Sequence, residues 1–361
     1  MSSHRLPALR FLVPLPLLAL LACSAQSPAP PPTAATPAPP PAPAKKFDPQ
    51  QRVQWYQACW AQFNDKKWDE FRNCYAPTAT ARHAGYGRAE VTGAADILAD
   101  SQQLTTIAPD VRGEQQLILV NNSRLASLSV LHGTQTGPMK DAQGADMKPT
   151  GKRFGFWFAH NIEVDTATEQ VTREFGVDDS ATMTAQIGLS HAPARPAMAA
   201  LKTPPTVVIA ANDAKEAANI GVERASVDAW NRHDPDAIAK TTAPKLLVHD
   251  ATAPRDMDTK ANNESNNEFW RGFGDARLTA RYWAAGDYVV VDGLFEGTND
   301  GDFAPMKIKK TGRKVTVPFL EIDRFEDGKV RESWVIFDSA SLAAQLTAPA
   351  AGEAAAPAAA K

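Results

Sequence analysis

The pattern that most clearly suggests a functional site is an aromatic stripe that ends in one histidine. Three phenylalanines and a histidine alternate with other residues, at Phe154, Phe156, Phe158 and His160. In a β-strand they would share one face, because successive side chains point to opposite sides. An apolar pocket with one polar group needs such a face, and imidazole is a base near neutral pH. An ordinary hydrophobic core with a satisfied histidine would show the same pattern, so both interpretations stay open.

A second strand-like segment, roughly 160 residues later, carries a carboxylate at the matching position. Its alternating face includes Phe319, Glu321 and Asp323, with Glu321 in the place of His160. A carboxylate at the edge of an apolar cavity can have a raised pKa and act as an acid or a base. It can equally form an ion pair, and the nearby partners are Arg281, Arg324 and Arg331. His160 and Glu321 are therefore the candidate catalytic residues.

The chain repeats itself at this offset, which indicates a duplicated domain. Three segments recur in the same order: 130–137 returns as 293–301, 150–153 as 311–314, and 179–188 as 338–347. Solenoid repeats have periods of about 20–50 residues, so a period this long indicates two copies of one domain.

The elements around these faces predict an α+β fold for each copy. Apolar residues at helical spacing open each copy, over 53–75 and from 220 to 230. The period then changes to two, and the predicted strands are 116–131, 153–164 and 170–177, then 277–283, 288–296, 314–325 and 329–337. Asp327-Gly328 is a strong hairpin signal. Helices followed by a run of antiparallel strands indicate α+β.

The amino-terminal residues 1–22 predict an export signal. Arg5 and Arg10 precede an apolar run that is shorter than the about 20 residues a membrane span needs. The sequence before Cys23 resembles the bacterial lipobox, which implies cleavage there and acylation of the Cys23 sulfur. A plain secretory signal with an accidental cysteine is the alternative. Ser24 resembles the Gram-negative outer-membrane sorting pattern, so we expect a lipid-anchored protein of the bacterial cell envelope that faces the periplasm.

Composition divides the rest of the chain. Residues 23–46 are mostly Pro, Ala and Thr and predict an extended tether. The proline-containing stretch 191–212 predicts an interdomain linker, and the Ala/Pro-rich stretch 348–361 predicts a disordered tail. The two domains are then 47–190 and 213–347, each an ordinary size for a single core.

Two cysteines of the first domain are placed for a disulfide. Cys59 and Cys74 lie at equal distances from Lys66-Lys67, the expected turn of a helical hairpin. Positions equidistant from such a turn can face each other, and the periplasm permits oxidation. We predict a Cys59–Cys74 disulfide, and two buried thiols in a core helix are the alternative.

The repeated motifs resemble those of the SnoaL-like family, which includes polyketide and ester cyclases and belongs to the nuclear transport factor 2-like superfamily. In the second copy the motifs are Gly297-Thr298-x-x-Gly301, Thr311-Gly312-Arg313, Phe325-x-Asp327-Gly328-Lys329 and Trp334-x3-Asp338-x6-Gln345. The first copy keeps Pro149-Thr150-Gly151-Lys152 but has a different turn at 165–169. The resemblance implies two cone-shaped domains, each a curved antiparallel sheet wrapped against helices around a pocket.

The resemblance also implies which residues line the pockets. His83 and His249 each follow the second helix of their copy, in a segment that borders the pocket mouth in the family. Gln135 and Asn299 stand where relatives often have a histidine. The expected ligand-binding residues are these four together with Phe156, Phe158 and Phe319.

The residue that carries the family's chemistry is missing from both copies. The characterised cyclases are thought to use an aspartate on the last strand, just upstream of a capping aspartate. Those positions hold Gly176 and Val335, and neither can move a proton. Asp179 and Asp338 lie where a strand ends and a helix begins, beside Ser or Thr, so we expect them to be helix N-caps.

Two functions are compatible with these observations. The first is an envelope lipoprotein whose domains bind a small apolar or aromatic ligand without cyclase chemistry and pair as an intramolecular pseudo-dimer. The second is an enzyme of the cyclase, isomerase or hydrolase range that uses pocket histidine and glutamate as acid and base. Lys plus Arg (38) nearly balances Asp plus Glu (41) without a basic stripe, which argues against nucleic acid. No residue spacing suggests a metal site, and no cofactor is expected.

Overall fold

The structure is a computed structural model that describes residues 48–84, 89–140, 146–191 and 193–348. Residues 44–361 form one compact unit that contains both predicted domains. The predicted export signal, Cys23, the tether and nearly all of the tail lie outside the described residues. Within the described ranges, no helix is long and apolar enough to span a membrane.

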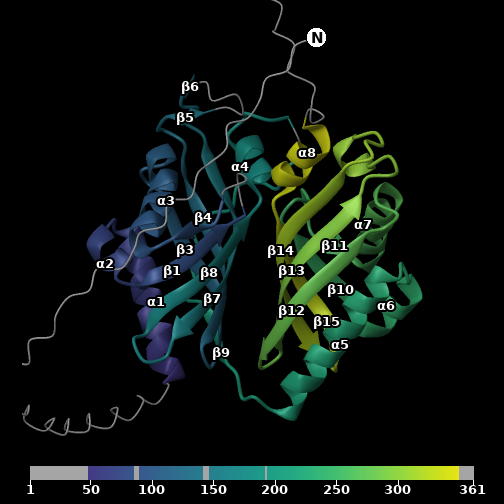
Figure 1. Ribbon diagram of the computed structural model, residues 1–361, viewed down its shortest axis with the longest axis horizontal. Coiled ribbons are helices and arrows are strands. Elements are labelled where there is room, and N and C mark those ends of the chain that lie inside the picture. The colour runs from purple at the N-terminus through teal and green to yellow at the C-terminus, as the bar shows by residue number, and fades with distance from the viewer. Residues whose placement is uncertain (1–47, 85–88, 141–145, 192, 349–361) are drawn as a thin grey trace, which may run out of the picture. The chain divides into compact units, whose positions relative to one another are not determined.

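The first domain packs its helices against a curved sheet (Figure 1). The helices are α1 (Pro49–Asn64), α2 (Trp68–Arg72), α3 (Ala94–Ile107) and α4 (Ser180–Gln186). The strand order is β2-β1-β8-β7-β4-β3-β9, in which β1 pairs parallel with β8 and the central strands are antiparallel. The strands are β1 (Tyr75–His83), β2 (Val91–Thr92), β3 (Arg112–Asn121), β4 (Arg124–Thr134), β7 (Arg153–Asp165), β8 (Gln170–Asp178) and β9 (Thr206–Ile209), with a separate hairpin of β5 (Met139–Lys140) and β6 (Asp146–Met147).

The second domain repeats this arrangement. Its helices are α5 (Ala214–Asn231), α6 (Pro235–Thr241), α7 (Thr259–Gly272) and α8 (Ser339–Thr347), with a short 3-10 turn η2 (Ala304–Met306). The strand order is β11-β10-β15-β14-β13-β12, and β10 pairs parallel with β15 as β1 does with β8. The strands are β10 (Thr242–Asp250), β11 (Met257–Asp258), β12 (Arg277–Ala285), β13 (Tyr288–Thr298), β14 (Lys314–Glu326) and β15 (Lys329–Phe337).

The α+β prediction is confirmed for both domains, with local errors and omissions. The helical segment predicted to reach residue 75 ends at Arg72, and Tyr75 opens β1. The predicted strand 116–131 is a hairpin, because the chain reverses at Asn122, whose φ is 46°, between β3 and β4. The first strand and third helix of each domain were not predicted. The turn at Asp327-Gly328 is confirmed: both residues have positive φ, and Glu326 pairs with Lys329.

The capping prediction is confirmed at both final helices. The Asp179 side chain accepts a hydrogen bond from the Thr182 backbone N–H at 3.0 Å, at the start of α4. Asp338 accepts from the Ser341 N–H at 3.2 Å, at the start of α8. Each carboxylate satisfies a backbone donor that the first turn of a helix leaves unpaired.

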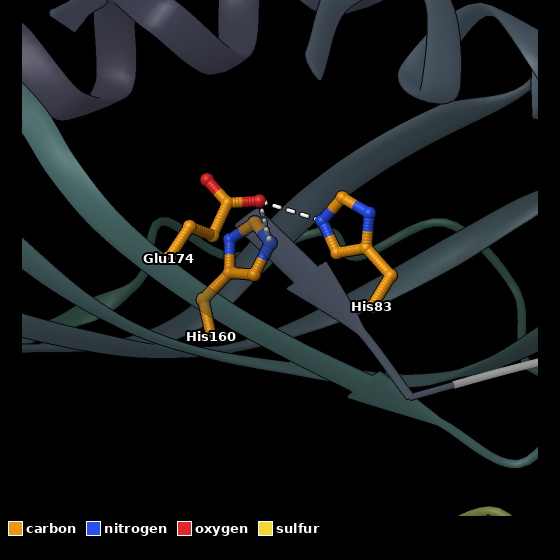
Figure 2. Close-up of side chains that lie close together, drawn as sticks. All are labelled: His83, His160 and Glu174. Atoms are coloured by element: carbon orange, nitrogen blue, oxygen red, sulfur yellow. Dashed lines mark hydrogen bonds and ion pairs between the residues drawn. The ribbon is translucent and has the colours of Figure 1, made fainter. Parts of the chain in front are cut away.

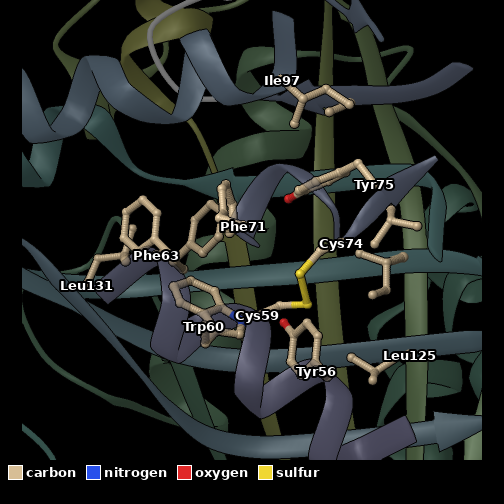
Figure 3. Close-up of a cluster of buried hydrophobic side chains, with 14 of the residues drawn as sticks. Tyr56, Cys59, Trp60, Phe63, Phe71, Cys74, Tyr75, Ile97, Leu125 and Leu131 are labelled. Carbon is tan, nitrogen blue, oxygen red and sulfur yellow. A yellow bond between two sulfur atoms is a disulfide. The ribbon is translucent and has the colours of Figure 1, made fainter. Parts of the chain in front are cut away.

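The predicted disulfide is also present. Cys59 of α1 is bonded to Cys74, which directly precedes β1, within a cluster of buried aromatic side chains (Figure 3). The bond closes a loop with a sequence separation of 15 residues. A disulfide that closes a loop of this length stabilises the folded state by about 3 kcal/mol, because it lowers the entropy of the unfolded chain.

The predicted linker contains more structure than its composition indicates. Four of its residues form β9, which pairs parallel with β3 and adds a strand to the first sheet. The Met198 backbone N–H donates to the Gly155 carbonyl, so this part of the linker lies close to β7. The chain between the domains is therefore attached to the first sheet and is not a free spacer.

Candidate functional site

The first domain encloses a cavity of about 90 Å³ between its helices and its sheet. Alternation along β7 points Phe156, Phe158 and His160 into it, as the sequence pattern predicted for one face of this strand. Apolar side chains from α1 and the Cys59–Cys74 disulfide form much of the opposite wall. Polar side chains reach this apolar cavity at only a few points.

The polar groups converge on Glu174, a residue that sequence reasoning missed. Its Oε1 lies 2.6 Å from His83 Nε2 and 3.3 Å from His160 Nε2, so that one carboxylate joins two histidines (Figure 2). Tyr75 donates its hydroxyl to Oε2 at 2.8 Å. All four side chains are buried. The histidines come from β1 and β7, and Glu174 comes from β8, which lies between them.

Further polar groups extend this centre in two directions. His83 Nδ1 lies 2.7 Å from Asp100 Oδ2, on α3. His160 Nδ1 lies 3.2 Å from the Tyr56 hydroxyl, which is 2.6 Å from Ser127 Oγ. The result is a continuous buried chain of polar groups from Asp100 to Ser127.

The two histidines differ in how their ring nitrogens are used. Both nitrogens of His83 face a carboxylate, and each contact needs a proton on nitrogen or on oxygen. An imidazolium between two carboxylates can donate to both of them and offsets one of the two negative charges. His160 Nε2 lies 3.3 Å from Glu174 Oε1, outside good hydrogen-bond geometry, and faces this one carboxylate only. His160 is therefore the histidine of the pair with the less constrained ring, and it lines the cavity.

The charge state of Glu174 follows from these neighbours. Burial alone would raise the pKa of the carboxyl group, but interactions with His160 and His83 hold it well below its usual value. Glu174 is thus ionised near neutral pH. Burial and the negative charge of Glu174 raise the pKa of Tyr75, which keeps its hydroxyl protonated as a donor.

The side chains around Gly176 leave no room on β8 for the aspartate that was expected at this position. Gly176 is in register with His83 on one side and with His160 on the other. A Cβ atom at this position would lie 2.6 Å from His83 Cδ2 and 3.0 Å from His160 Cδ2, closer than packed atoms tolerate. An aspartate here would displace the histidines. The carboxylate comes instead from Glu174, two residues earlier on the same face of β8.

The second domain has a larger cavity, of about 180 Å³, with a different polar set. Phe319 and Glu321 line it, as the alternation along β14 predicted, and Asp323 lies beside them. Glu321 Oε1 accepts from the Ser333 hydroxyl at 2.9 Å. A third acid, Glu223 of α5, completes a buried acidic group.

These acids are not ion-paired with the arginines that the sequence offered. Arg281 pairs with Asp292, Arg324 with Glu332, and Arg331 with Glu326. Burial and neighbouring carboxyl groups raise the pKa of Glu321 and Asp323 well above their usual values. The same causes raise the pKa of Glu223 to about 8.

His249 was predicted from the sequence to line a pocket, but it does not line the cavity of the second domain. In register terms, Asp250 and not His249 is the counterpart of His83, because Asp250 pairs with Val335 as His83 pairs with Gly176. His249 therefore lies on the opposite face of its sheet, where it stacks on Trp334 and meets Trp157 edge-on. Burial lowers its pKa, but hydrogen bonds to Glu332 and Asp256 outweigh this effect and raise it.

The placement of Gln135 and Asn299 at the pockets is also wrong. Both side chains are fully buried and connect backbone segments: Gln135 bonds to Gly137 and Thr150, and Asn299 bonds to Gly301 and Thr311. Neither lines a cavity. Their recurrence in both copies reflects a shared structural role.

Both cavities bring together atoms of the types that bind metal ions. His83, His160 and Glu174 form one such group, and Glu223, Glu321 and Asp323 form the other, each with ligand atoms within 4.8 Å of one another. Sequence spacing could not reveal them, because their members come from different elements. In the first group, a metal would have to replace the His83–Glu174 contact of 2.6 Å.

Both domains are α+β cones with acid–base groups buried at an apolar cavity, an architecture suited to small organic ligands. The model of the SnoaL-like polyketide cyclase family matches residues 50–187 and again residues 221–346. The chain belongs to this family and carries two copies of its domain.

Several solved structures are similar to part of the chain. AclR, a putative hydroxylase from Streptomyces galilaeus, is 26% identical, with a TM-score of 0.34, over 36% of this chain and 96% of its own. A putative SnoaL-like polyketide cyclase from Jannaschia sp. CCS1 is 20% identical, with a TM-score of 0.36, over 38% and 97%. IdmH, a putative polyketide cyclase from Streptomyces antibioticus, is 23% identical, with a TM-score of 0.33, over 36% and 97%. Among curated proteins, none matches this chain.

Proposed function

We propose that the first domain is an acid–base catalyst that removes and returns a proton next to a carbonyl group of a small apolar or aromatic substrate. The observation that carries the proposal is the position of His160 at an aromatic cavity, with the Glu174 carboxylate 3.3 Å from its Nε2. A base must face the proton that it abstracts. Glu174, 3.3 Å away, stabilises the imidazolium that forms.

Binding without chemistry is the second candidate, and the size of the cavity favours it. Its volume of about 90 Å³ is below the ~300–1,000 Å³ of typical ligand sites. A cavity of this size holds a small fragment and not a whole polyketide. A catalytic role on a larger substrate requires the helices to move away from the sheet.

Exchange of α-hydrogens separates the two candidates. A panel of small ketones, from acetone to 1-indanone, is incubated with the protein in D₂O, and deuterium incorporation is followed by NMR. We expect exchange above the buffer rate, and we expect His160→Gln to reduce the protein-dependent rate by ~10²–10⁴-fold, the usual contribution of a general base. His132→Gln is the matched control, because His132 is a buried sheet histidine outside the cavity. Binding of ketones without exchange would support the binding role and contradict catalysis.

We further propose that the protein is a component of the bacterial envelope that is lipid-anchored by acylation of Cys23 and faces the periplasm at the outer membrane. The support is the lipobox-like sequence before Cys23 and the Pro/Ala-rich stretch after it. One acyl chain gives only marginal membrane binding, so several chains are needed for a stable anchor. In cells fed an alkyne fatty acid, the wild type should be labelled and sediment with membranes. Cys23→Ser should be unlabelled, and equal labelling of both would contradict this proposal.

We also propose that the two domains pair within the chain as a pseudo-dimer. Support comes from one buried apolar cluster with members in both halves, among them Trp157 and Trp334. Reciprocal hydrogen bonds add to it: Asp179 accepts from Ser339, and Asp338 accepts from Ser180. Such pairing would fix the sheets against each other and leave both cavities on the helix-covered sides.

A further inference from the structure

The cavity of the second domain combines several acids with no basic group. Four carboxyl side chains line it, Glu223, Asp250, Glu321 and Asp323, and its described lining includes no Lys, Arg or His. In the first cavity, by contrast, two histidines stand beside the acids. Buried carboxylates are costly unless a positive charge or hydrogen bonds compensate them.

Two oxygen atoms of this group lack partners outside it. Glu223 Oε2 and Asp323 Oδ1 are buried and accept no hydrogen bond from any other kind of group, and a hydrogen bond between the two carboxyl groups themselves needs a shared proton. Their residues are only 3% and 1% exposed. Both side chains line the cavity. Buried polar atoms without partners are uncommon in proteins and point to a group that is needed to complete them. A donor placed in the cavity would satisfy them.

The rest of the lining indicates what kind of donor fits. The same cavity is also lined by aromatic rings, from Trp230, Phe269, Phe295, Phe319 and Phe337. Faces of aromatic rings attract organic cations, and this attraction strengthens when water is excluded. A naked divalent metal ion would prefer more oxygen ligands and water. The volume of about 180 Å³ compares with a cavity of about 150 Å³ that holds benzene.

The duplicated domains show that three of these acidic positions are specific to the second copy. Counting from the ends of the matching helices, at Asn64 and Asn231, Glu223 stands where the first domain has Tyr56. Glu321 stands in the place of His160, and Asp323 in the place of Ile162. Three neutral or basic positions are acidic here, and all three changes lie in one cavity.

We propose that the second cavity binds a small organic cation, whose ammonium group is held by Glu223, Glu321 and Asp323 among the aromatic rings of the lining. In the free protein, the group keeps protons that lower its negative charge. The cation replaces them, and each displaced proton passes to the buffer. This role is independent of the acid–base function proposed for the first domain.

Tetramethylammonium is a suitable probe, because its charge does not change with pH, and tert-butanol is a neutral molecule of similar shape. Isothermal titration of the full chain should show tetramethylammonium binding at least 10-fold tighter than tert-butanol at pH 8. Titrations in buffers of different ionisation enthalpy should show net proton release. Affinity should rise at least 10-fold from pH 6 to pH 9. The groups that face the acids and can titrate with them are Asp250 on β10 and Tyr282 on β12, with Arg224 over the Tyr282 ring.

Variants locate the binding in this cavity. Glu321→Gln and Asp323→Asn should each weaken tetramethylammonium binding at least 10-fold, whereas Glu326→Gln should not, because Glu326 lies on the same strand but is exposed. If the cavity variants fail to fold, the comparison of the two probes on the wild type still decides. Equal affinity for tert-butanol, no binding of tetramethylammonium, or binding of Mg²⁺, Ca²⁺ or Zn²⁺ without it would each overturn the proposal.

Discussion

Replacing Glu223 by glutamine should remove a pH-dependent loss of stability worth roughly 5 kcal/mol between pH 3 and pH 9. The pKa of Glu223 is about 8 in the folded protein, raised by burial and by Glu321. In an unfolded chain a glutamate has a pKa of about 4.3. A shift of one unit corresponds to about 1.4 kcal/mol, which gives the expected total.

The sign follows from proton counting. Between the two pKa values the folded state holds a proton on Glu223 that the unfolded state has released. The unfolded state therefore binds fewer protons, and the free energy of unfolding falls as the pH rises. The stabilisation is fully present below the unfolded pKa and is lost as the pH approaches 8.

Urea unfolding at a series of pH values measures this effect. The difference in unfolding free energy between Glu223→Gln and the wild type should shift by ~5 kcal/mol in favour of the variant from pH 3 to pH 9. Glu326→Gln, with an exposed carboxyl group, should run parallel to the wild type. Parallel curves for Glu223→Gln would show that Glu223 is ionised and compensated in the folded protein.

Much of the fold was predictable because the local periodicity of apolar residues indicates most of its helices and strands. The alternation along β7, β14 and β15 and the Asp-Gly turn are properties of neighbouring residues, and their elements formed as expected. The strands β1 and β10 were missed because each pairs in parallel with a strand roughly 90 residues later in the chain. A parallel neighbour leaves no hairpin turn in the sequence.

The site was predictable only in part. Period-two alternation correctly predicted that His160 and Glu321 face the cavities, because the side of a strand on which a side chain lies depends only on its position in the local sequence. Glu174 was not predicted, because the family's aspartate was expected at position 176. Counting by two from Gly176 reaches Glu174 on the same face of β8. Asp100 and Glu223 come from helices whose rotation the sequence does not fix. Gln135 and Asn299 show that a repeated polar residue can serve the scaffold in both copies.

The two cavities have diverged in the charge that they can accommodate. The first keeps histidines with Glu174 and can hold or transfer a proton, whereas the second has replaced the histidine with acids. Asp250, Val335 and Glu321 lie in one row across the second sheet, as His83, Gly176 and His160 do in the first. The two copies share this row of positions but differ in the side chains that occupy it.

Cutting the chain between the domains should leave the two halves bound to each other. A protease site inserted between Lys202 and Thr203, where both residues are exposed, allows cleavage of the folded protein. The halves should co-elute in size exclusion at micromolar concentration, because their shared cluster buries large side chains worth ~1.5–3 kcal/mol each. Separation without denaturant would contradict the pseudo-dimer.

The carboxylates at the two final helices should contribute much of this affinity. Asp179 accepts two hydrogen bonds from Ser339 of the other half, at 2.9 and 2.6 Å, in addition to capping its own helix. Hydrogen bonds to charged groups contribute ~1.5–3 kcal/mol each, so Asp179→Ala should weaken the cleaved complex at least ~100-fold. Asp234→Ala removes a cap of the same kind at α6 that serves only the second domain, so it should leave the affinity of the halves unchanged. An equal effect of both variants would mean that Asp179 acts only through the stability of its helix.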